Sequence, residues 1–276
     1  MIINWFPGHM NKSLREMEDR IKTVDAVVYV LDSRAPFSCI NPELDRLSEG
    51  RPVIYVLNKA DLVESSDSAK WATKLSKTGA GAVVLNSTAT NAAKVLADKL
   101  RTACATKIDR LKNRGVTAVI RAMVIGVPNS GKSTLINNLC GKAKTITGNR
   151  AGVTRGQQWV KIAPTLEVLD TPGTLYPKLD NRETALNLAF IGSIRDEVLD
   201  IHGLAIELIK RLSGSGALER RYGTTLSDDP VESLRKIAVA RGFLVKGGDA
   251  DTERAAYAVI DDFRKGRMGK IILEKA

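Results

Sequence analysis

Residues 126–134 have the side chains and the spacing of a loop that binds phosphate. They read Gly-Val-Pro-Asn-Ser-Gly-Lys-Ser-Thr and contain the pattern Gly-x-x-x-x-Gly-Lys-Ser. An apolar run precedes the loop and helical periodicity follows it, which disfavours an ordinary glycine-rich turn. In such a loop, lysine reaches the β- and γ-phosphates and the serine hydroxyl binds Mg²⁺. The residues expected to hold a nucleotide here are Asn129, Ser130, Gly131, Lys132, Ser133 and Thr134.

Two shorter motifs could recognise a guanine base. Asn-Lys-x-Asp follows the apolar run 53–57, and Asn-Ser-Thr follows the run 82–85. The aspartate can accept two hydrogen bonds from the guanine N1–H and exocyclic amine, each worth roughly 1.5–3 kcal/mol, and adenine cannot supply that pair. Taken alone, each motif could equally be a solvated loop at the end of a strand. The residues expected at the base are Asn58, Lys59, Asp61, Asn86, Ser87 and Thr88.

Two segments after the phosphate loop could respond to a γ-phosphate. Residues 142–154 are rich in glycine, threonine and basic residues and are expected to form a mobile loop. Thr154 could place its hydroxyl on Mg²⁺ and its N–H on the γ-phosphate. The run 166–169 ends in Asp170-Thr-Pro-Gly, where Asp170 would hold Mg²⁺ through water and the Gly173 amide would sense the γ-phosphate. The predicted magnesium ligands are therefore Ser133, Thr154 and Asp170.

The elements that position these residues are predicted to form two parts. Buried apolar runs alternate with amphipathic helices up to residue 177, which predicts an α/β fold with a doubly wound, mostly parallel sheet. The base motifs precede the phosphate loop, so the order is circularly permuted relative to the usual P-loop GTPase. We expect a circularly permuted GTPase domain over residues 1–177. Helical patterns in 184–191, 197–212, 230–241 and 251–264 predict a smaller all-helical domain over 178–276.

The charge of the chain favours a polyanionic partner. Its 276 residues hold 42 Lys plus Arg against 31 Asp plus Glu, a net charge of +11. Nucleic acid is the first candidate and an anionic membrane the second, while solubility alone is the plainer alternative. Residues 91–113 are predicted to form one long basic helix, either with a solvated face or as part of an RNA footprint. The basic segment 265–273 is predicted to be a tail that contacts a nucleic-acid backbone.

Cysteine use and hydropathy point to the cytoplasm. Cys39, Cys104 and Cys140 are widely spaced and form no Cys-x-x-Cys pair, which disfavours a disulfide framework or a zinc site. No apolar run approaches the 18 residues of a membrane span, and the sequence leaves no room for a signal peptide. We therefore expect a cytoplasmic protein with no membrane partner.

The whole chain resembles a known family. The permuted order of the motifs, the opening Trp5-Phe-Pro-Gly-His-Met and the closing Gly266-Arg-Met-Gly are similar to the bacterial ribosome biogenesis GTPase A family. The resemblance implies GTP hydrolysis coupled to a late step of 50S subunit assembly, with GTP or GDP and Mg²⁺ as ligands. It also implies that the partner is the large subunit and its rRNA, bound by a C-terminal helical RNA-binding domain. We expect a monomer and no DNA partner.

Hydrolysis would be in-line attack of water on the γ-phosphate, with Lys132 and Thr154 among the catalytic residues. Ras-like enzymes orient that water with a glutamine after Asp-x-x-Gly, but Thr174 stands there and departs from the aliphatic residue of the family pattern. We therefore predict slow turnover that ribosomal particles stimulate. His9 is either the substitute that orients water, as the resemblance implies, or a structural residue of the turn. Asn129 stands where related GTPases bind K⁺.

Two other functions compete with this interpretation. The chain could be an RNA-binding assembly scaffold in which GTP is a structural or switch ligand with little hydrolysis. It could also be a permuted GTPase of the small subunit, but that group carries a Cys/His zinc site, which three scattered cysteines and two histidines cannot build.

Overall fold

The computed structural model describes residues 8–141, 157–175 and 181–276, with only the backbone described at residues 8 and 9. Within these residues the core is one six-stranded sheet with the order β3-β2-β1-β4-β6-β5. All neighbouring strands are parallel except β5, which pairs antiparallel with β6 at one edge. The strands are β1 (Ala26–Asp32), β2 (Val53–Asn58), β3 (Gly81–Val84), β4 (Ile120–Ile125), β5 (Gln158–Ala163) and β6 (Leu166–Asp170).

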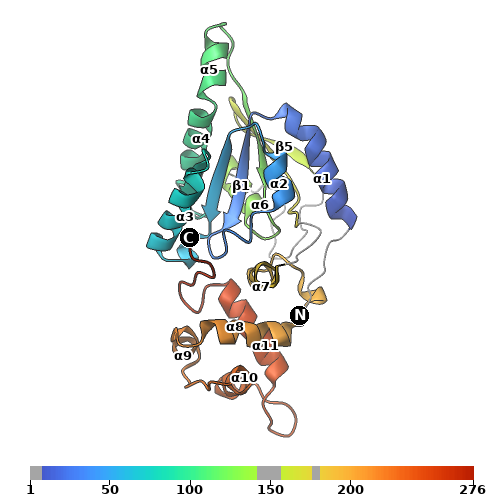
Figure 1. Cartoon of the computed structure of the whole chain (residues 1–276), viewed down its shortest axis with the longest axis vertical. Coiled ribbons are helices and arrows are strands. Elements are labelled where there is room, and N and C mark those ends of the chain that lie inside the picture. The colour runs from blue at the N-terminus through green and yellow to red at the C-terminus, as the bar shows by residue number, and fades with distance from the viewer. Residues whose placement is uncertain (1–7, 142–156, 176–180) are drawn as a thin grey trace.

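Helices cover both faces of the sheet (Figure 1). Side chains alternate between the faces, so that Val27, Tyr29 and Leu31 of β1 join one apolar cluster while Val28 and Val30 join the other. The first cluster takes residues from α1 (Gly8–Arg20), α2 (Pro42–Leu47) and α3 (Ser65–Ser76). The second takes residues from α4 (Ala92–Ala103) and α6 (Lys132–Cys140). This arrangement confirms the predicted doubly wound, mostly parallel α/β fold.

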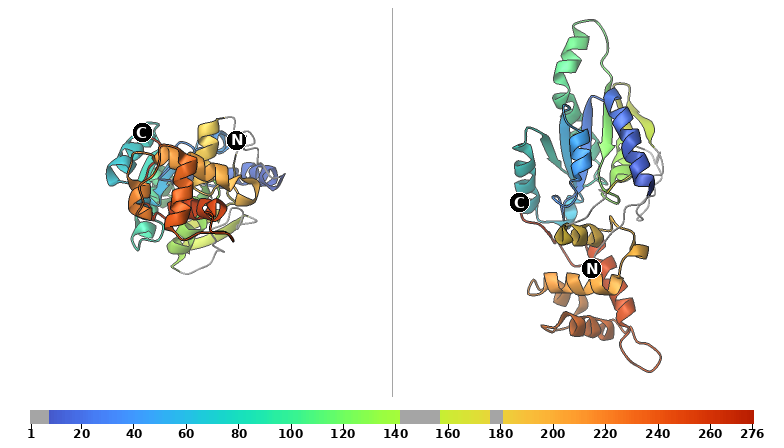
Figure 2. Two further views of the ribbon diagram at one scale, coloured as in Figure 1. Left: turned by 90° about the horizontal axis from the view of Figure 1, so that it is seen from below. Right: turned by 45° about the vertical axis from the view of Figure 1, so that its right-hand side comes forward.

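Helices continue the chain beyond residue 181. They are α7 (Arg182–Phe190), α8 (Ile201–Leu212), α9 (Ala217–Tyr222), α10 (Pro230–Ala240) and α11 (Thr252–Arg264). We call residues 181–276 the helical segment. Four of these helices lie where the periodicity predicts them, whereas the six residues of α9 are too few for a periodic pattern. The right view in Figure 2 shows the helical segment below the sheet, and its buried apolar side chains belong to the same apolar cluster as α1.

The described residues also form three short 3-10 helices: η1 (Ile21–Thr23), η2 (Ala60–Leu62) and η3 (Asp196–Val198). Helix α5 (Ala105–Lys112) follows α4 and rises above the sheet in Figure 1. No helix among the described residues is long and apolar enough to cross a membrane.

One prediction about local structure is wrong. The long basic helix expected over 91–113 is interrupted at Cys104, whose backbone leaves the helical region (φ −104°, ψ 16°). The break falls where packing on the sheet ends, because α4 buries Leu96 and Leu100 whereas α5 buries no residue. The chain after α11 is bonded to loops that follow β1 and β2. The Ile271 N–H donates to the Leu62 carbonyl at 3.0 Å and the Leu273 N–H to the Arg34 carbonyl at 2.8 Å. Its contact with a nucleic-acid backbone stays a prediction.

Candidate nucleotide-binding site

All the predicted motifs within the described residues follow the carboxyl ends of parallel strands. Asp32 and Asn58 are paired residues at the ends of β1 and β2, and Val124 of β4 pairs with Asp170 at the end of β6. Because the strands are parallel, these ends lie along the same edge of the sheet. The fold thereby brings together the phosphate loop, the base motifs and Asp170, which are up to 112 residues apart in the sequence.

The phosphate loop depends on two glycines. Gly126 has φ +144°, and a Cβ there would collide with the Val30 carbonyl of the neighbouring strand. Gly131 has φ +97°, and its Cβ would collide with Nδ2 of Asn58. These positions therefore require glycine for both backbone angle and space. Immediately after Gly131 the chain enters α6, whose first N–H groups face the loop and add partial positive charge.

Lys132 and Asp170 form the charged centre of the site. Lys132 Nζ donates to the carbonyls of Gly126 at 3.0 Å and Val127 at 2.8 Å, and only 6% of the residue is exposed. Burial lowers the pKa of Lys132 to about 8, against the opposing charge of Asp170. Burial likewise raises the pKa of Asp170 to about 6, although Lys132 and the Ser133 hydroxyl favour its ionised form. Burial thus disfavours the charged form of both side chains. A bound anion would favour the charged lysine, and a bound cation would favour the ionised aspartate.

The surroundings of Asp170 fit a divalent cation. Its carboxylate is buried, and neither oxygen makes a hydrogen bond of good geometry to any residue that the structure describes. Ser133, the predicted magnesium ligand of the phosphate loop, lies close enough to Asp170 to lower its pKa. Hard oxygen ligands of this kind suit Mg²⁺. Among the described residues no group of three or more His, Cys, Asp and Glu could hold a metal by itself.

Asn58 joins the base motifs to the phosphate loop. Its Nδ2 donates to the Ser130 carbonyl at 2.7 Å. Its Oδ1 accepts from the Ser87 N–H at 2.9 Å and from the Ser87 hydroxyl at 2.7 Å. Asn58 itself is 1% exposed, so these bonds are shielded from water. The structure therefore brings together three segments that the sequence analysis linked only through their expected ligand.

The remaining base residues lie around this connection. Asp61 is exposed in η2, where a base could reach its carboxylate. The Asn86 side chain accepts from the Thr88 N–H at 2.9 Å and from the Thr88 hydroxyl at 2.7 Å, which shapes the loop after β3. Lys59 has the left-handed backbone angle φ +57°, and its Nζ donates to the Asn129 carbonyl of the phosphate loop at 2.7 Å.

A buried ion network that the sequence analysis missed supports Lys59. Asp32, at the end of β1, pairs with Lys59 at 2.9 Å and with Arg34 at 2.7 Å. Burial opposes ionisation of Asp32, but the charges and hydrogen bonds of Arg34 and Lys59 outweigh it and hold the pKa of that carboxyl well below its usual range. Arg34 also donates to the carbonyls of Phe263 at 3.1 Å and Arg264 at 3.3 Å, at the end of α11. In the sequence, the only signal of this ion network was an aspartate at the end of a buried strand.

The helical segment also contacts the phosphate loop directly. The Ser193 hydroxyl donates to the Pro128 carbonyl at 2.7 Å, and Nδ2 of Asn129 donates to the Ile191 carbonyl at 3.4 Å. Asn129 has φ +60°, and a Cβ on Gly192 would lie 2.9 Å from its Nδ2. The residue expected to bind K⁺ is therefore part of an interface with the loop after α7. Nothing in the spacing of residues 191–193 indicated this contact.

Gly173 and Thr174 lie against the phosphate loop. A Cβ on Gly173 would come within 2.5 Å of the Pro128 Cα and 3.0 Å of Lys132 Nζ, so this glycine is required for the close approach. Thr174 is fully buried, and its hydroxyl donates to the Pro172 carbonyl at 3.2 Å. A buried hydroxyl with this partner is not placed to orient water. Thr154 and the side chain of His9 lie outside the described residues.

Comparisons with known proteins agree with this geometry. A family model described as a 50S ribosome-binding GTPase matches residues 121–222. Ribosome biogenesis GTPase A of Bacillus cereus is 35% identical over 278 residues, which cover 99% of this chain and 94% of that protein. The protein of the same name from Thermotoga maritima is 32% identical, over 99% of this chain and 94% of its own length.

A solved structure has the same fold. The crystal structure of GNP-bound YlqF from T. maritima aligns with a TM-score of 0.69 and 28% identity, over 96% of this chain and 98% of that one. The comparisons confirm the predicted GTPase fold, guanine-nucleotide binding and GTP hydrolysis. With similarity to these relatives across nearly its full length, the chain belongs to the ribosome biogenesis GTPase A family of circularly permuted GTP hydrolases.

Proposed function

We propose that this GTPase binds the precursor of the large ribosomal subunit through its rRNA and couples GTP binding and hydrolysis to a late step of 50S assembly. The matching family model is described as 50S ribosome-binding, and the relatives are named for ribosome biogenesis. The net charge of +11 suits an RNA partner, because Lys and Arg release counterions from phosphates when they bind. In this proposal the protein is a cytoplasmic monomer with residues 1–177 as GTPase domain and 178–276 as RNA-binding domain.

The observation that carries the coupling is the contact between the helical segment and the phosphate loop. Ser193 donates to Pro128, and Asn129 donates to Ile191. Movement of the loop on nucleotide exchange or hydrolysis would change these bonds. The helical segment would thereby bind RNA with an affinity that depends on the nucleotide state, as a two-state switch requires.

Each site residue has a proposed task. Asp61 accepts from guanine and the Lys59 stem covers the ring, while backbone N–H groups of the loop 86–88 contact the guanine oxygen. The N–H groups of residues 129–134 and of Gly173 hold the phosphates, and Lys132 leaves the carbonyls of its own loop to bind them. Ser133 and Asp170, with Thr154, would hold Mg²⁺, which when bound neutralises charge that develops on the phosphates.

Two further residues are proposed to assist hydrolysis. The His9 imidazole orients the attacking water, since Thr174 is buried and has no amide to do so. Asn129 contributes its side-chain oxygen to a K⁺ site beside the phosphate loop, where a second cation would stabilise the transition state. This role leaves its Nδ2 bonded to Ile191.

GTP turnover with and without large-subunit particles tests the proposal. We expect slow hydrolysis alone and marked stimulation by the particles. Loss of a positioned water-orienting group costs on the order of 10²–10⁴ in rate, so His9→Ala should lose most of the stimulated turnover. His202→Ala is the matched control, because His202 is the other histidine of the chain and contacts Thr252 in the helical segment.

The outcomes separate the competing functions. Binding to the particles without stimulated turnover would favour the scaffold in which GTP is only a structural or switch ligand. Equal stimulated rates for wild type and His9→Ala would end the catalytic role of His9. Equal rates in K⁺ and Na⁺ buffers would remove the K⁺ site at Asn129.

A further inference from the structure

Helix α5 packs weakly, with Ile108 partly buried against the second apolar cluster. None of its residues is buried, whereas α4 before it buries Ala92, Leu96 and Leu100. A helix of eight residues is marginal in water by itself. It nevertheless rises beyond the sheet, at the end of the molecule opposite the helical segment (Figure 1). We call residues 105–116 the α5 arm.

The arm is strongly basic and its charges are largely unneutralised. Between residues 105 and 114 it carries four basic side chains and one acidic one. Lys107 is occupied, since its Nζ pairs with Asp25 at 2.6 Å and donates to the Val119 carbonyl at 2.9 Å, which fixes the base of the arm. The other three, Arg110, Lys112 and Arg114, are exposed and form no ion pair with any described residue.

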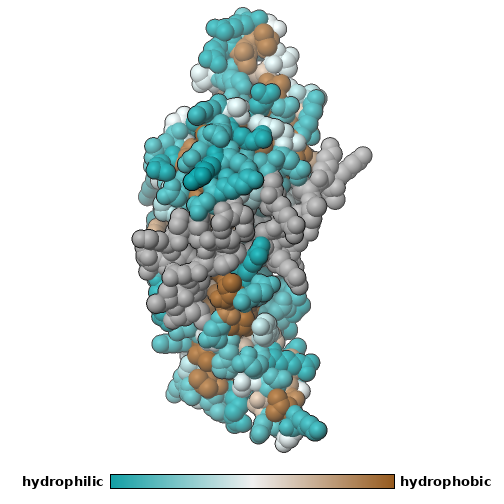
Figure 3. All heavy atoms as spheres, turned by 90° about the vertical axis from the view of Figure 1, so that its right-hand side faces the viewer, coloured by the Kyte–Doolittle hydropathy of each residue, from teal (hydrophilic) through white to brown (hydrophobic). Residues whose placement is uncertain are grey.

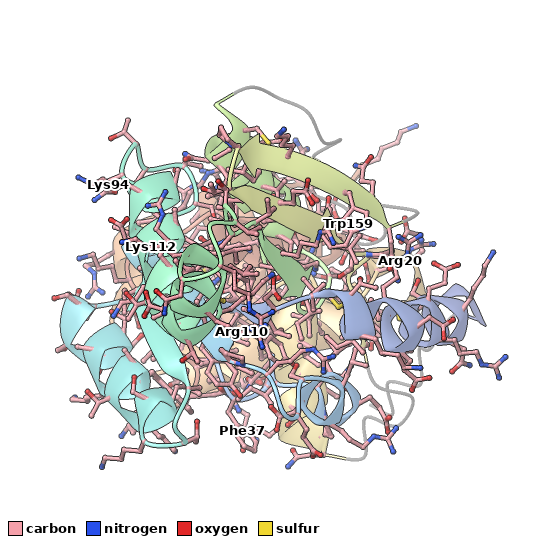
Figure 4. All side chains as sticks on the ribbon, turned by 90° about the horizontal axis from the view of Figure 1, so that it is seen from above. Arg20, Phe37, Lys94, Arg110, Lys112 and Trp159 are labelled. Carbon is pink, nitrogen blue, oxygen red and sulfur yellow. The ribbon has the colours of Figure 1, made fainter. Side chains whose placement is uncertain are left out.

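Figure 4 looks down onto the end of the molecule that carries the arm, and shows Lys112 of α5 on the side away from Arg20 of α1. Hydrophilic residues surround a small apolar patch at the upper end of the face in Figure 3, and Val116 of the arm is 52% exposed. The arm therefore presents its cations together with isolated apolar side chains.

The simplest alternative explanation for the basic residues of the arm is that positive charge is favourable at the C-terminus of a helix. Basic residues in the last turn offset the helix dipole, each by about 0.3–1 kcal/mol. That accounts for Arg110 and Lys112 in the last turn of α5. It does not account for Arg114, which lies beyond the end of the helix.

We propose that the α5 arm is a second RNA contact, which binds the phosphate backbone at the end of the molecule opposite the helical segment. This inference rests on the proposed RNA partner. Lys and Arg side chains that contact phosphates respond to the charge and shape of the RNA and carry no sequence information directly. Two contacts on one body make the second binding event intramolecular, so the arm also fixes how the nucleotide site is oriented on the RNA.

The test uses the full-length protein with Arg110→Glu, Lys112→Glu and Arg114→Glu combined. These residues are remote from the nucleotide site, so basal GTP turnover and the melting temperature should not change. Binding to large-subunit particles and to protein-free large-subunit rRNA is measured at several KCl concentrations. Each phosphate contact contributes about 1 to the slope of log affinity against log salt, so the slope should fall by about 2–3 and affinity by at least about tenfold.

A matched variant carries the same change in charge on exposed residues elsewhere, Lys22→Glu, Lys70→Glu and Lys77→Glu. It should retain a slope within about one unit of wild type. Equal losses in the two variants would overturn the inference, because net charge alone would then explain them. A loss confined to the particles and absent on protein-free rRNA would also overturn it, since the arm would then contact a ribosomal protein. Wild type that binds neither probe would instead refute the proposed function, and the arm's role with it.

Discussion

Replacing Asp170 by asparagine should stabilise the nucleotide-free protein at neutral pH. Burial raises the pKa of this carboxyl from 3.8 to about 6. Each unit of pKa difference corresponds to about 1.4 kcal/mol, so ionisation at pH 7.5 costs the folded state about 3 kcal/mol relative to the unfolded chain. Asparagine is uncharged and nearly isosteric, and it avoids this cost. We expect a gain of about 1–3 kcal/mol, the lower value applying if the amide leaves a buried polar group without a partner.

The gain should depend on pH in a defined window. Between about pH 4 and pH 6 the folded wild type binds more protons at Asp170 than the unfolded chain does. Wild-type stability at this residue is therefore highest below pH 4, falls as the pH rises to 6 and is constant above it. Asparagine has no such dependence, so the advantage of the variant should grow through this window and then level off.

Urea denaturation of wild type and Asp170→Asn at pH 4.5, 6 and 7.5, without nucleotide or Mg²⁺, measures the effect. Asp228→Asn serves as the control, because Asp228 is exposed and distant in sequence from every site motif. A second series with saturating GDP and Mg²⁺ should reverse the order, since only the carboxylate favours the cation. An advantage of Asp170→Asn that is the same at all three pH values would refute the assignment of a buried, destabilising charge.

Three further substitutions test the framework of the site. Asn58→Ala should cost about 1–3 kcal/mol of unfolding free energy in urea and weaken GDP binding measured by fluorescence, because two buried backbone groups lose their partner. Arg34→Met should lower stability by about 3–5 kcal/mol by leaving the Asp32 charge without its arginine partner, a loss that would be absent if the network were solvated. Gly131→Ala should abolish GDP binding. Gly50→Ala is the control, because Gly50 has φ +75° and open space around it, and it should cost only about 1 kcal/mol of unfolding free energy. Equal effects of the two substitutions on stability and GDP binding would contradict the contact between Gly131 and Asn58.

The motifs of the candidate nucleotide site can be recognised in the sequence because they depend on local spacing. Gly131 and Lys132 are adjacent residues of one turn, and the strand before them is recognisable from its apolar run. Because the strands are parallel, Asn58 at the end of β2 must lie at the same edge of the sheet, and this follows from the strand assignment alone. The fold class follows for the same reason, since each buried strand carries its own signal.

Contacts that join remote segments could not be predicted in this way. Arg34 donates to carbonyls 229 and 230 positions away, and a backbone carbonyl carries no signature in the sequence. The break at Cys104 depends on where packing against the sheet stops, which periodicity does not record. The tail after α11 contains basic residues, but Lys265 and Arg267 are paired with Asp261 of the preceding helix.

Glu274 shows how that tail is attached to the rest of the fold. Burial raises the pKa of its carboxyl, although the N–H groups of Phe37 and Ser38 and the Asn187 amide favour the ionised form. Its own carbonyl accepts from the Trp71 indole N–H at 3.1 Å. One residue near the C-terminus thereby connects the loop after β1, helix α3 and helix α7.

Both halves of the nucleotide site are therefore attached to the helical segment. The phosphate loop is bonded to the loop after α7 through Pro128 and Ser193. The base side is bonded to α11 through Lys59, Asp32 and Arg34. A nucleotide that contacts both the phosphate loop and the base motifs must bind in the geometry that these hydrogen bonds and ion pairs impose. A change in the bonds of one motif to the helical segment would therefore shift the other motif as well. The proposed coupling between nucleotide and RNA then needs no long relay, because the phosphate loop and the helical segment are in direct contact.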